Sequence, residues 1–277
     1  DDIELVAMST KGDRVLDRAL NLIGGKGLFT EEIEAALLDG RIDLAVHSTK
    51  DMPTMLPDGL KMTCFLERED PRDAFICLKA SSMMDLPKGA VVGTASLRRQ
   101  AQLKRLRPDL ETVVFRGNVQ TRLKKLAADE VDATFLAVAG LNRMDMQQHI
   151  TETVDIETLL PAPAQGAIGI ETRQNDASID DLLKPLNHRD TLLAVMAERA
   201  FLRVLDGSCR TPIAALATLL GGKITLKGKV LSPDGKQCFE IEKHGLAQDA
   251  EILGHDAGIA IKQQAGEAFF EQLKAIT

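Results

Sequence analysis

Cys209 stands in the segment DGSCRTP, residues 206–212, between turn-forming residues and an arginine. The other three cysteines lie in apolar, strand-like runs, as buried cysteines usually do; they are Cys64, Cys77 and Cys238. An exposed, electropositive loop lowers the pKa of a thiol and makes it reactive. The spacing alone leaves a reactive role and a structural role for Cys209 equally open.

Five arginines in the middle of the chain stand at matching places after predicted strands; they are Arg98, Arg99, Arg116, Arg122 and Arg143. The carboxyl ends of parallel strands meet at one edge of a sheet, where α/β proteins bind ligands. Thr94 or Ser96 could cap the helix that follows, and the free N–H groups at its start also favour an anion. Single basic residues on helices are usually solvated surface, but five at equivalent turns predict a cleft for several carboxylates or phosphates.

Asp51 lies in the segment HSTKD, directly after an apolar run at residues 41–48. A carboxylate at the end of a strand can act as an acid or a base. An aspartate in a surface turn before Pro53 is the common alternative. Facing an arginine-lined cleft, Asp51 becomes a candidate for handling a cation.

The elements that position these residues alternate between strands and helices. Residues 2–8 predict a strand, 9–27 a mobile loop, 28–40 a helix and 41–48 a strand typical of a parallel sheet covered on both faces. Three strand–turn–helix units follow, at 90–106, 112–126 and 132–144, and a further strand is predicted within 165–173. This alternation predicts an α/β fold.

The end of the chain has a different pattern. A helix at 191–205 leads towards Cys209, and the later strands and helix are predicted at 213–220, 223–231, 237–245 and 256–273. The last two strands are joined by the hairpin signal SPDGK. A small α+β domain is expected here. The predicted domains cover residues 1–66 plus 167–186, 72–160, and 189–277.

Composition argues against several classes of protein. The net charge of −7 and the absence of Trp and Tyr argue against nucleic-acid binding, although the basic segment 97–125 keeps that alternative open. No apolar run is long enough for a membrane span, and the histidines lack metal-ligand spacing. Four scattered cysteines favour a reducing, cytoplasmic setting. A two-lobed anion-binding protein without catalytic activity is the main alternative to an enzyme.

Taken together, short segments across nearly the whole chain resemble the porphobilinogen deaminase (hydroxymethylbilane synthase) family. They are GGKGLF, DLAVHSTKDMP, EREDPRDAF, VGTASLRRQAQL, RGNVQTRL, LAVAGLNR, QGAIGIE, AERAFL and GSCRTPI. The resemblance implies two doubly wound lobes like those of periplasmic binding proteins, plus a small C-terminal domain. It also implies a monomeric cytoplasmic transferase of tetrapyrrole biosynthesis.

The resemblance assigns roles to the candidate residues. Cys209 would carry a dipyrromethane cofactor through a thioether, and four porphobilinogen molecules would be added to it head to tail. Asp51 would assist loss of ammonia and stabilise the cationic azafulvene. The carboxylates of the pyrroles would be bound by the five arginines, with Lys50, Ser48, Thr94, Ser96 and Gln165 nearby.

Two departures from the family pattern accompany the resemblance. The family's opening motif, R-x-A-T-R-x-S-x-L-A, does not occur in the sequence, so the first sheet is expected to lack a strand if that segment is truly missing. Some members also carry a second lysine four residues before Lys26, where Leu22 stands. Lys26 is therefore the weaker candidate for a substrate contact.

Overall fold

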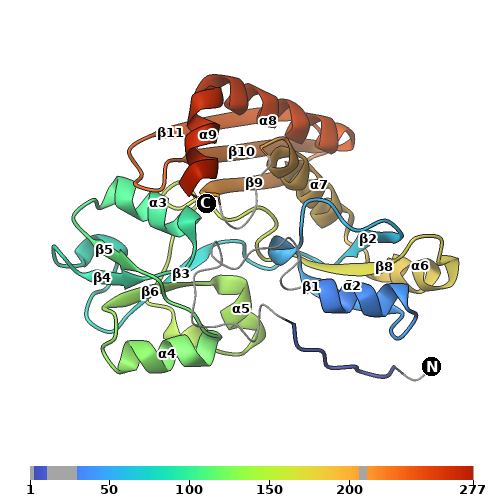
Figure 1. Ribbon diagram of the computed structural model, residues 1–277, viewed down its shortest axis with the longest axis horizontal. Coiled ribbons are helices and arrows are strands. Elements are labelled where there is room, and N and C mark those ends of the chain that lie inside the picture. The colour runs from blue at the N-terminus through green and yellow to red at the C-terminus, as the bar shows by residue number, and fades with distance from the viewer. Residues whose placement is uncertain (1–2, 11–29, 206–210, 277) are drawn as a thin grey trace.

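The computed structural model describes residues 3–10, 30–205 and 211–276, which form three sheets with surrounding helices (Figure 1). The strands are β1 (Leu44–Ser48), β2 (Leu60–Phe65), β3 (Asp73–Cys77), β4 (Val91–Gly93), β5 (Glu111–Val113), β6 (Ala133–Ala137), β7 (Glu152–Thr153), β8 (Ile168–Arg173), β9 (Ile213–Leu220), β10 (Lys223–Leu231) and β11 (Cys238–Leu246). The α-helices are α2 (Glu31–Leu38), α3 (Leu97–Leu106), α4 (Val119–Ala127), α5 (Val138–Arg143), α6 (Ala177–Leu183), α7 (Arg189–Val204), α8 (Ala250–Ala265) and α9 (Glu267–Ile276). Short 3-10 turns are η2 (Thr49–Asp51), η3 (Met83–Asp85), η4 (Gln147–His149), η5 (Lys184–Leu186) and η6 (Ala247–Asp249).

The first sheet has the strand order β1-β8-β2, and both pairings are antiparallel. The expectation of a parallel, doubly covered strand at 41–48 is wrong for the described residues. Ala45 and His47 are buried, whereas Val46 on the other face is 60% exposed. Helix α2 packs Leu37 against Ala45, which explains why only one face is buried. The strand expected at 2–8 is also absent from the described residues 3–8, which have no regular structure.

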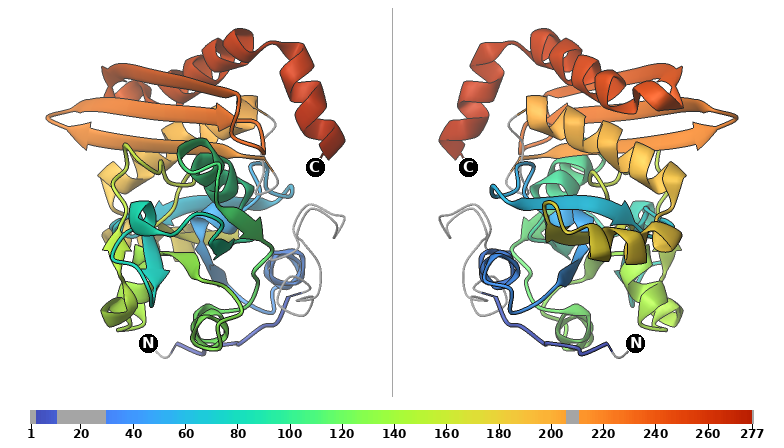
Figure 2. Two further views of the ribbon diagram at one scale, coloured as in Figure 1. Left: turned by 90° about the vertical axis from the view of Figure 1, so that its left-hand side faces the viewer. Right: turned by 90° about the vertical axis from the view of Figure 1, so that its right-hand side faces the viewer.

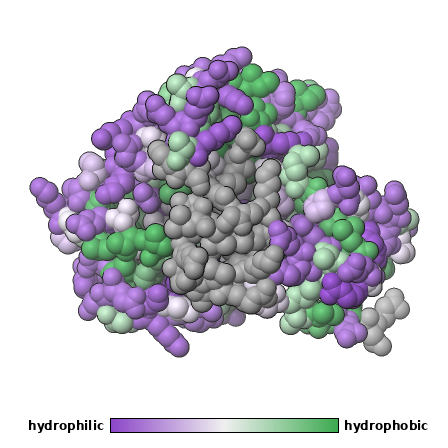
Figure 3. Space-filling view, viewed as in Figure 1, coloured by the Kyte–Doolittle hydropathy of each residue, from purple (hydrophilic) through white to green (hydrophobic). Residues whose placement is uncertain are grey.

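The second sheet has the order β5-β4-β6-β3-β7 and carries the three predicted strand–turn–helix units. Strand β4 runs parallel to β5 and β6, while β3 pairs antiparallel with β6 and β7. Alternate residues of β3 enter two different apolar clusters: Phe75 packs with Leu103 of α3, and Ile76 packs with Leu126 of α4. Helices therefore cover both faces of this sheet. Val113 of its edge strand β5 and the following Val114 are exposed, and Figure 3 shows hydrophobic surface on the side of the molecule where Figure 1 labels β5.

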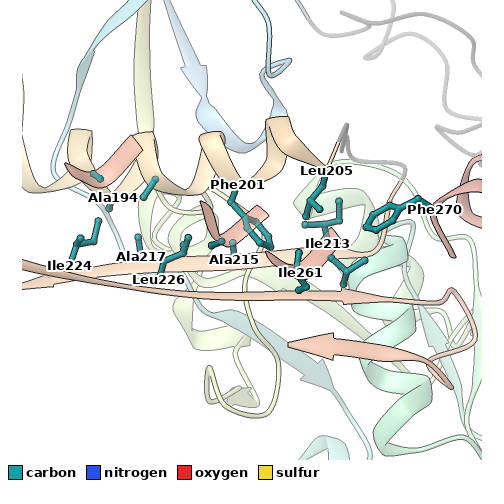
Figure 4. Packing of buried hydrophobic residues seen from close by; sticks show 14 of the residues in the cluster. Ala194, Phe201, Leu205, Ile213, Ala215, Ala217, Ile224, Leu226, Ile261 and Phe270 are labelled. Carbon is teal, nitrogen blue, oxygen red and sulfur yellow. The ribbon is translucent and has the colours of Figure 1, made fainter. Parts of the chain in front are cut away.

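The third sheet is the antiparallel meander β11-β10-β9, covered by α7 and α8. Its core centres on Phe201 of α7, which packs with residues of β9, β10 and α8 (Figure 4). The single helix expected at 256–273 is wrong. The structure has two helices, α8 and α9, which meet at a sharp angle in Figure 2. Gly266 separates them with φ +79°, a left-handed conformation that a side chain would strain.

Glu198 of α7 connects the segments between the sheets. Its fully buried carboxylate accepts hydrogen bonds from Arg68 Nη1 at 2.6 Å, the Ala164 backbone N–H at 2.5 Å and the Ala217 backbone N–H at 2.7 Å. Arg68 and Ala164 lie on the two crossings between the first and second sheets, and Ala217 is in β9. A buried charge with this many donors is stabilised in place, so it fixes how the three parts meet.

Each sheet lies within one of the three predicted domain ranges, whose boundaries stay predictions. The predicted mixed α/β class with a small C-terminal α+β part is confirmed. Among the described residues, no helix is both long and apolar enough to cross a membrane.

Candidate active site

A cleft of about 390 Å³ opens where the three parts of the molecule meet. The 3-10 turn η2 contributes Lys50 and Asp51, and the second sheet contributes its strand–helix turns. The crossing segment contributes Gln165, and the third part contributes Leu202, Thr211 and Ile213. The further lining residues are Ala95, Ser96, Arg98, Arg99, Gly117, Asn118, Val119, Arg122, Leu136, Ala137, Gly140, Ala162 and Pro163.

The turn that carries Lys50 and Asp51 is anchored where it begins. Just before it, His47 Nε2 lies 3.0 Å from the fully buried carboxylate of Glu171, and the Thr49 N–H donates to the Ala167 carbonyl at 3.0 Å. Asp51 is exposed at the cleft, whereas Lys50 is half-buried. Burial lowers the pKa of Lys50, as do Arg99 and Arg98, while Asp51 and Asp73 oppose that shift. The cleft thus places an exposed carboxylate next to a partly desolvated ammonium group.

Arg98 and Arg99 share one buried carboxylate, that of Asp73. Arg98 Nη1 donates to Asp73 Oδ2 at 2.7 Å, and Arg99 Nη2 donates to Asp73 Oδ1 at 2.6 Å. Asp73 is fully buried; burial alone would raise its pKa, but Arg98 and Arg99 hold the pKa well below its usual range. Each arginine also donates to a backbone carbonyl, Arg98 to Leu160 and Arg99 to Phe135. Both guanidinium groups are therefore held rigidly at the wall of the cleft.

Arg122 differs, because in the described part of the chain no carboxylate pairs with it. Its Nε donates to the Gly117 carbonyl at 2.8 Å. Burial, together with the nearby charges of Arg99 and Arg116, lowers the pKa of Arg122 to about 10. A half-buried guanidinium with other cations nearby is a site where an anionic ligand is stabilising.

The remaining predicted residues fall into three groups. Gln165 lines the cleft, where its Oε1 accepts from Lys50 Nζ at 3.4 Å and its Nε2 donates to Asp73 Oδ1 at 2.9 Å. Ser96 lines the cleft as the N-cap of α3, and the buried Thr94 hydroxyl accepts from the Ser96 N–H at 3.1 Å. Residues that do not line the cleft are Ser48, Thr94, Arg116 and Arg143.

Arg143 takes a different place from the one expected. Its Nη2 donates to the Gly166 carbonyl at 2.8 Å, on the crossing segment between the sheets. Two predicted residues, Cys209 and Lys26, lie outside the described residues. The cleft is lined by Leu202 and Thr211, which precede and follow residues 206–210 in the sequence.

Sequence analysis missed Asp73 and Glu171. Both begin or lie within apolar strands, and a lone acid in such a run signals a buried partner. The sequence offered that signal at Asp73 in DAFIC, but it did not indicate which basic residue would be the partner. The pairing with Arg98 and Arg99 appears only in the folded chain.

The charges of the cleft fit a ligand with several carboxylates. Asp73 neutralises part of the charge of Arg98 and Arg99. Lys50 and Arg122 also line the cleft, and among its described lining residues the only carboxylate is that of Asp51. A dipyrromethane bears four carboxylates, and Thr211, two residues after its predicted attachment point Cys209 in the sequence, lines the cleft. The residues present therefore suit such a group.

Comparisons with known proteins agree with this chemistry. A family model described as the dipyromethane cofactor binding domain of porphobilinogen deaminase matches residues 1–181, and the model of that enzyme's C-terminal domain matches residues 192–263. This chain belongs to the porphobilinogen deaminase family. The porphobilinogen deaminase of Nitrobacter hamburgensis is 52% identical over 268 residues, which are 97% of this chain and 85% of that protein. The predicted family, transferase class and dipyrromethane cofactor are thereby confirmed.

Solved structures give weaker matches to this chain. The aliphatic sulphonate binding protein SsuA of Escherichia coli has a TM-score of 0.38 and 17% identity, over 62% of this chain and 56% of that one. The VFT2 domain of Bordetella pertussis BvgS has a TM-score of 0.34 and 19% identity, over 55% and 64%.

Proposed function

We propose that this chain joins four porphobilinogen molecules head to tail on a covalent primer, releasing ammonia and finally hydroxymethylbilane. The observation that carries the proposal is the composition of the cleft. One exposed carboxylate, Asp51, faces the same space as Lys50, Arg98, Arg99 and Arg122. Porphobilinogen needs both features, because its aminomethyl group leaves as ammonia while its acetate and propionate groups remain anionic.

The basic residues are proposed to bind and orient the carboxylates. Arg122 is the strongest candidate, since it has no carboxylate partner in the described part of the chain and its burial favours an anionic ligand. Lys50 lines the cleft from the turn η2, and its Nζ donates to Gln165 Oε1 at 3.4 Å. Arg98 and Arg99 are already fixed by Asp73, so they present a preorganised positive wall that does not have to rearrange when a ligand binds.

Asp51 is proposed to act on the departing amine. The residue is exposed in the cleft at the end of an anchored turn, so its carboxylate can stabilise positive charge as it develops on the substrate. The same carboxylate can accept the proton that leaves the ring after the new bond forms. No other lining residue is a carboxylate, which assigns both steps to Asp51 within the described part of the cleft.

When bound through a thioether to Cys209, the dipyrromethane group supplies the pyrrole carbon that is extended. The chain contributes the attachment point and the basic surface around it. Thr211, two residues after Cys209, lines the cleft, so attachment there is compatible with a primer that reaches Arg122 and Asp51.

The decisive experiment measures the intact mass of the denatured protein, followed by peptide mapping. We expect extra mass equal to two linked pyrrole units on the peptide that contains Cys209. If Cys209 is unmodified, the protein is incubated with porphobilinogen or with preformed hydroxymethylbilane. A cysteine that neither compound loads would overturn the proposal and favour a protein that only binds anions.

Asp51→Asn separates catalysis from primer attachment. The variant should keep the two-ring mass and the native unfolding free energy but lose most turnover of porphobilinogen. Cys209→Ser is the matched control, because it should lose the mass and the activity together. Wild-type turnover in Asp51→Asn would refute the catalytic role.

Other parts of the sequence-based prediction stay proposals. These are the monomeric state, the cytoplasmic location, the lack of nucleic-acid binding, the domain boundaries, and roles for Ser48, Thr94, Ser96, Arg116, Arg143 and Lys26 in binding. Gel filtration with light scattering tests the first, and salt-dependent binding to duplex DNA tests the third.

A further inference from the structure

A second concave site lies away from the cleft, between the loop at 54–56, strand β2 and helix α7. Its volume is about 540 Å³, within the roughly 300–1,000 Å³ of small-molecule sites. It shares no lining residue with the cleft. We call it the α7 groove; its lining residues are Thr54, Met55, Leu56, Met62, Thr63, Phe65, Leu192, Val195, Met196, Arg199, Arg203 and Glu251. The side of the molecule on which α7 lies along the first sheet faces the reader in the right panel of Figure 2.

The walls of the α7 groove are apolar and adaptable. Phe65 and Val195 are buried at its base, while Met62 and Met196 are partly buried and Met55 is 65% exposed. Methionine side chains are flexible and polarisable, and they are frequent on surfaces that accept varied apolar groups. The groove therefore offers an unbranched apolar body a surface that can adjust to it.

One end of the groove carries a guanidinium group, that of Arg199, with no carboxylate in direct contact among the described residues. Arg199 Nη2 donates to the Pro53 carbonyl at 2.6 Å and to the Thr54 carbonyl at 3.4 Å, and no carboxylate pairs with it in the part of the chain that the structure describes. Burial and the neighbouring charge of Arg203 together lower the pKa of Arg199 to about 10, and the carboxylate of Glu171 opposes that shift. Arg203 already pairs with Glu251 at 3.2 Å. Arg199 is thus a cation that has no carboxylate in direct contact among the described residues.

We propose that the α7 groove binds a small amphipathic carboxylate, with its carboxylate on Arg199 and its apolar body along the methionines. The charge of Arg199 selects this ligand class. A cation would be repelled by Arg199, and an uncharged ligand would form no ion pair with it. Arginine has five N–H donors, so Arg199 can bind a carboxylate while it keeps its hydrogen bond to the Pro53 carbonyl. The described lining residues of the groove differ from those of the cleft, although both sites draw on helix α7.

The test uses octanoate as the probe and the complete protein with its methionines carrying ¹³C-labelled methyl groups. Signals assigned through single Met→Leu variants report where the probe binds. We expect millimolar octanoate to shift the signals of Met55, Met62 and Met196. We expect 1-octanol, the uncharged analogue, to bind about tenfold more weakly, because a charge-assisted hydrogen bond is lost.

Two variants and one control make the result decisive. Arg199→Gln should weaken octanoate binding about tenfold. Arg189→Gln is the matched control, since Arg189 is an exposed arginine on the same helix outside the groove, and it should bind normally. If Arg199→Gln fails to fold, Met55→Glu at an exposed position places a competing carboxylate in the groove and should weaken binding similarly. Unchanged affinity in the folded variant, or shifts that avoid the three methionines, would overturn the proposal.

Discussion

Arg98 and Arg99 at the start of α3, and Arg122 in α4, occupy matching turns of the same sheet but meet opposite surroundings. The first pair shares the buried carboxylate of Asp73 and donates to two backbone carbonyls. Arg122 has the Gly117 carbonyl as its partner and no carboxylate in the described chain. Equivalent sequence positions therefore supply a rigid wall in one place and a free positive charge in the other.

The two kinds of surroundings give these arginines different roles. Arg98 and Arg99 contribute to stability, and Arg122 is available for binding. Buried guanidinium groups that share a carboxylate hold the structure together, and removing that carboxylate leaves charges that water cannot reach. A half-buried arginine without an acid adds little to stability but gains strongly from an anionic ligand. The following changes test this division between Asp73 with its arginines and Arg122.

Asp73→Ala should produce the largest effect on stability. It leaves two buried arginines without their anion, so the unfolding free energy is expected to fall by about 3–5 kcal/mol. Urea unfolding measures the loss. Asp70→Ala is the control, because the Arg72–Asp70 pair is more exposed and should contribute about 1 kcal/mol or less. Equal losses in the two variants would contradict the distinction.

Acid unfolding should reveal how much the Asp73 carboxylate contributes to the unfolding free energy. The pKa of Asp73 is held below its unfolded value, so its contribution is complete above about pH 4 and is lost as the pH falls towards the folded pKa. The unfolding free energy of the wild type should therefore drop more steeply than that of Asp73→Asn in that range. Parallel curves from urea unfolding at each pH would show that Asp73 is not linked to acid stability.

Arg122→Ala should impair the use of the substrate and leave the stability nearly unchanged. We expect kcat/KM for porphobilinogen to fall about tenfold to a hundredfold, since a charged hydrogen bond to the ligand is lost. The unfolding free energy should change by about 1 kcal/mol or less. Lys124→Ala, at an exposed position on the same helix, should leave both quantities unchanged. Normal chain extension by Arg122→Ala would remove it from the binding site.

The helix caps give the smallest effect. Ser96 accepts a hydrogen bond from the Arg99 N–H, and Asn118 accepts one from the Thr121 N–H at the start of α4. Ser96→Ala and Asn118→Ala should each lower the unfolding free energy by about 1 kcal/mol. A much larger loss for Ser96→Ala would mean that the cap, and not Asp73, holds Arg98 and Arg99 in place.

Local patterns explain how much of the architecture was predictable. The three strand–turn–helix units and the β10–β11 hairpin follow from periodicity and turn residues within a few positions of each other. The break at Gly266 also had a local signal, a glycine between two amphipathic stretches, which the predicted single helix ignored. The direction of β1 had no such signal, because it depends on β8, more than a hundred residues later.

By itself, the sequence determined the family, the α/β class and the residue types needed for the chemistry. It placed Asp51 after a strand and the arginines after matching strands, since those features depend on neighbouring residues. Only the tertiary structure decided which arginine is free. Asp73 reaches Arg98 and Arg99 across 25 and 26 residues of chain, and burial makes that pairing strong. Charge compensation is set by what lies nearby in space, and therefore Arg122 and Arg199 stand out only in the folded molecule.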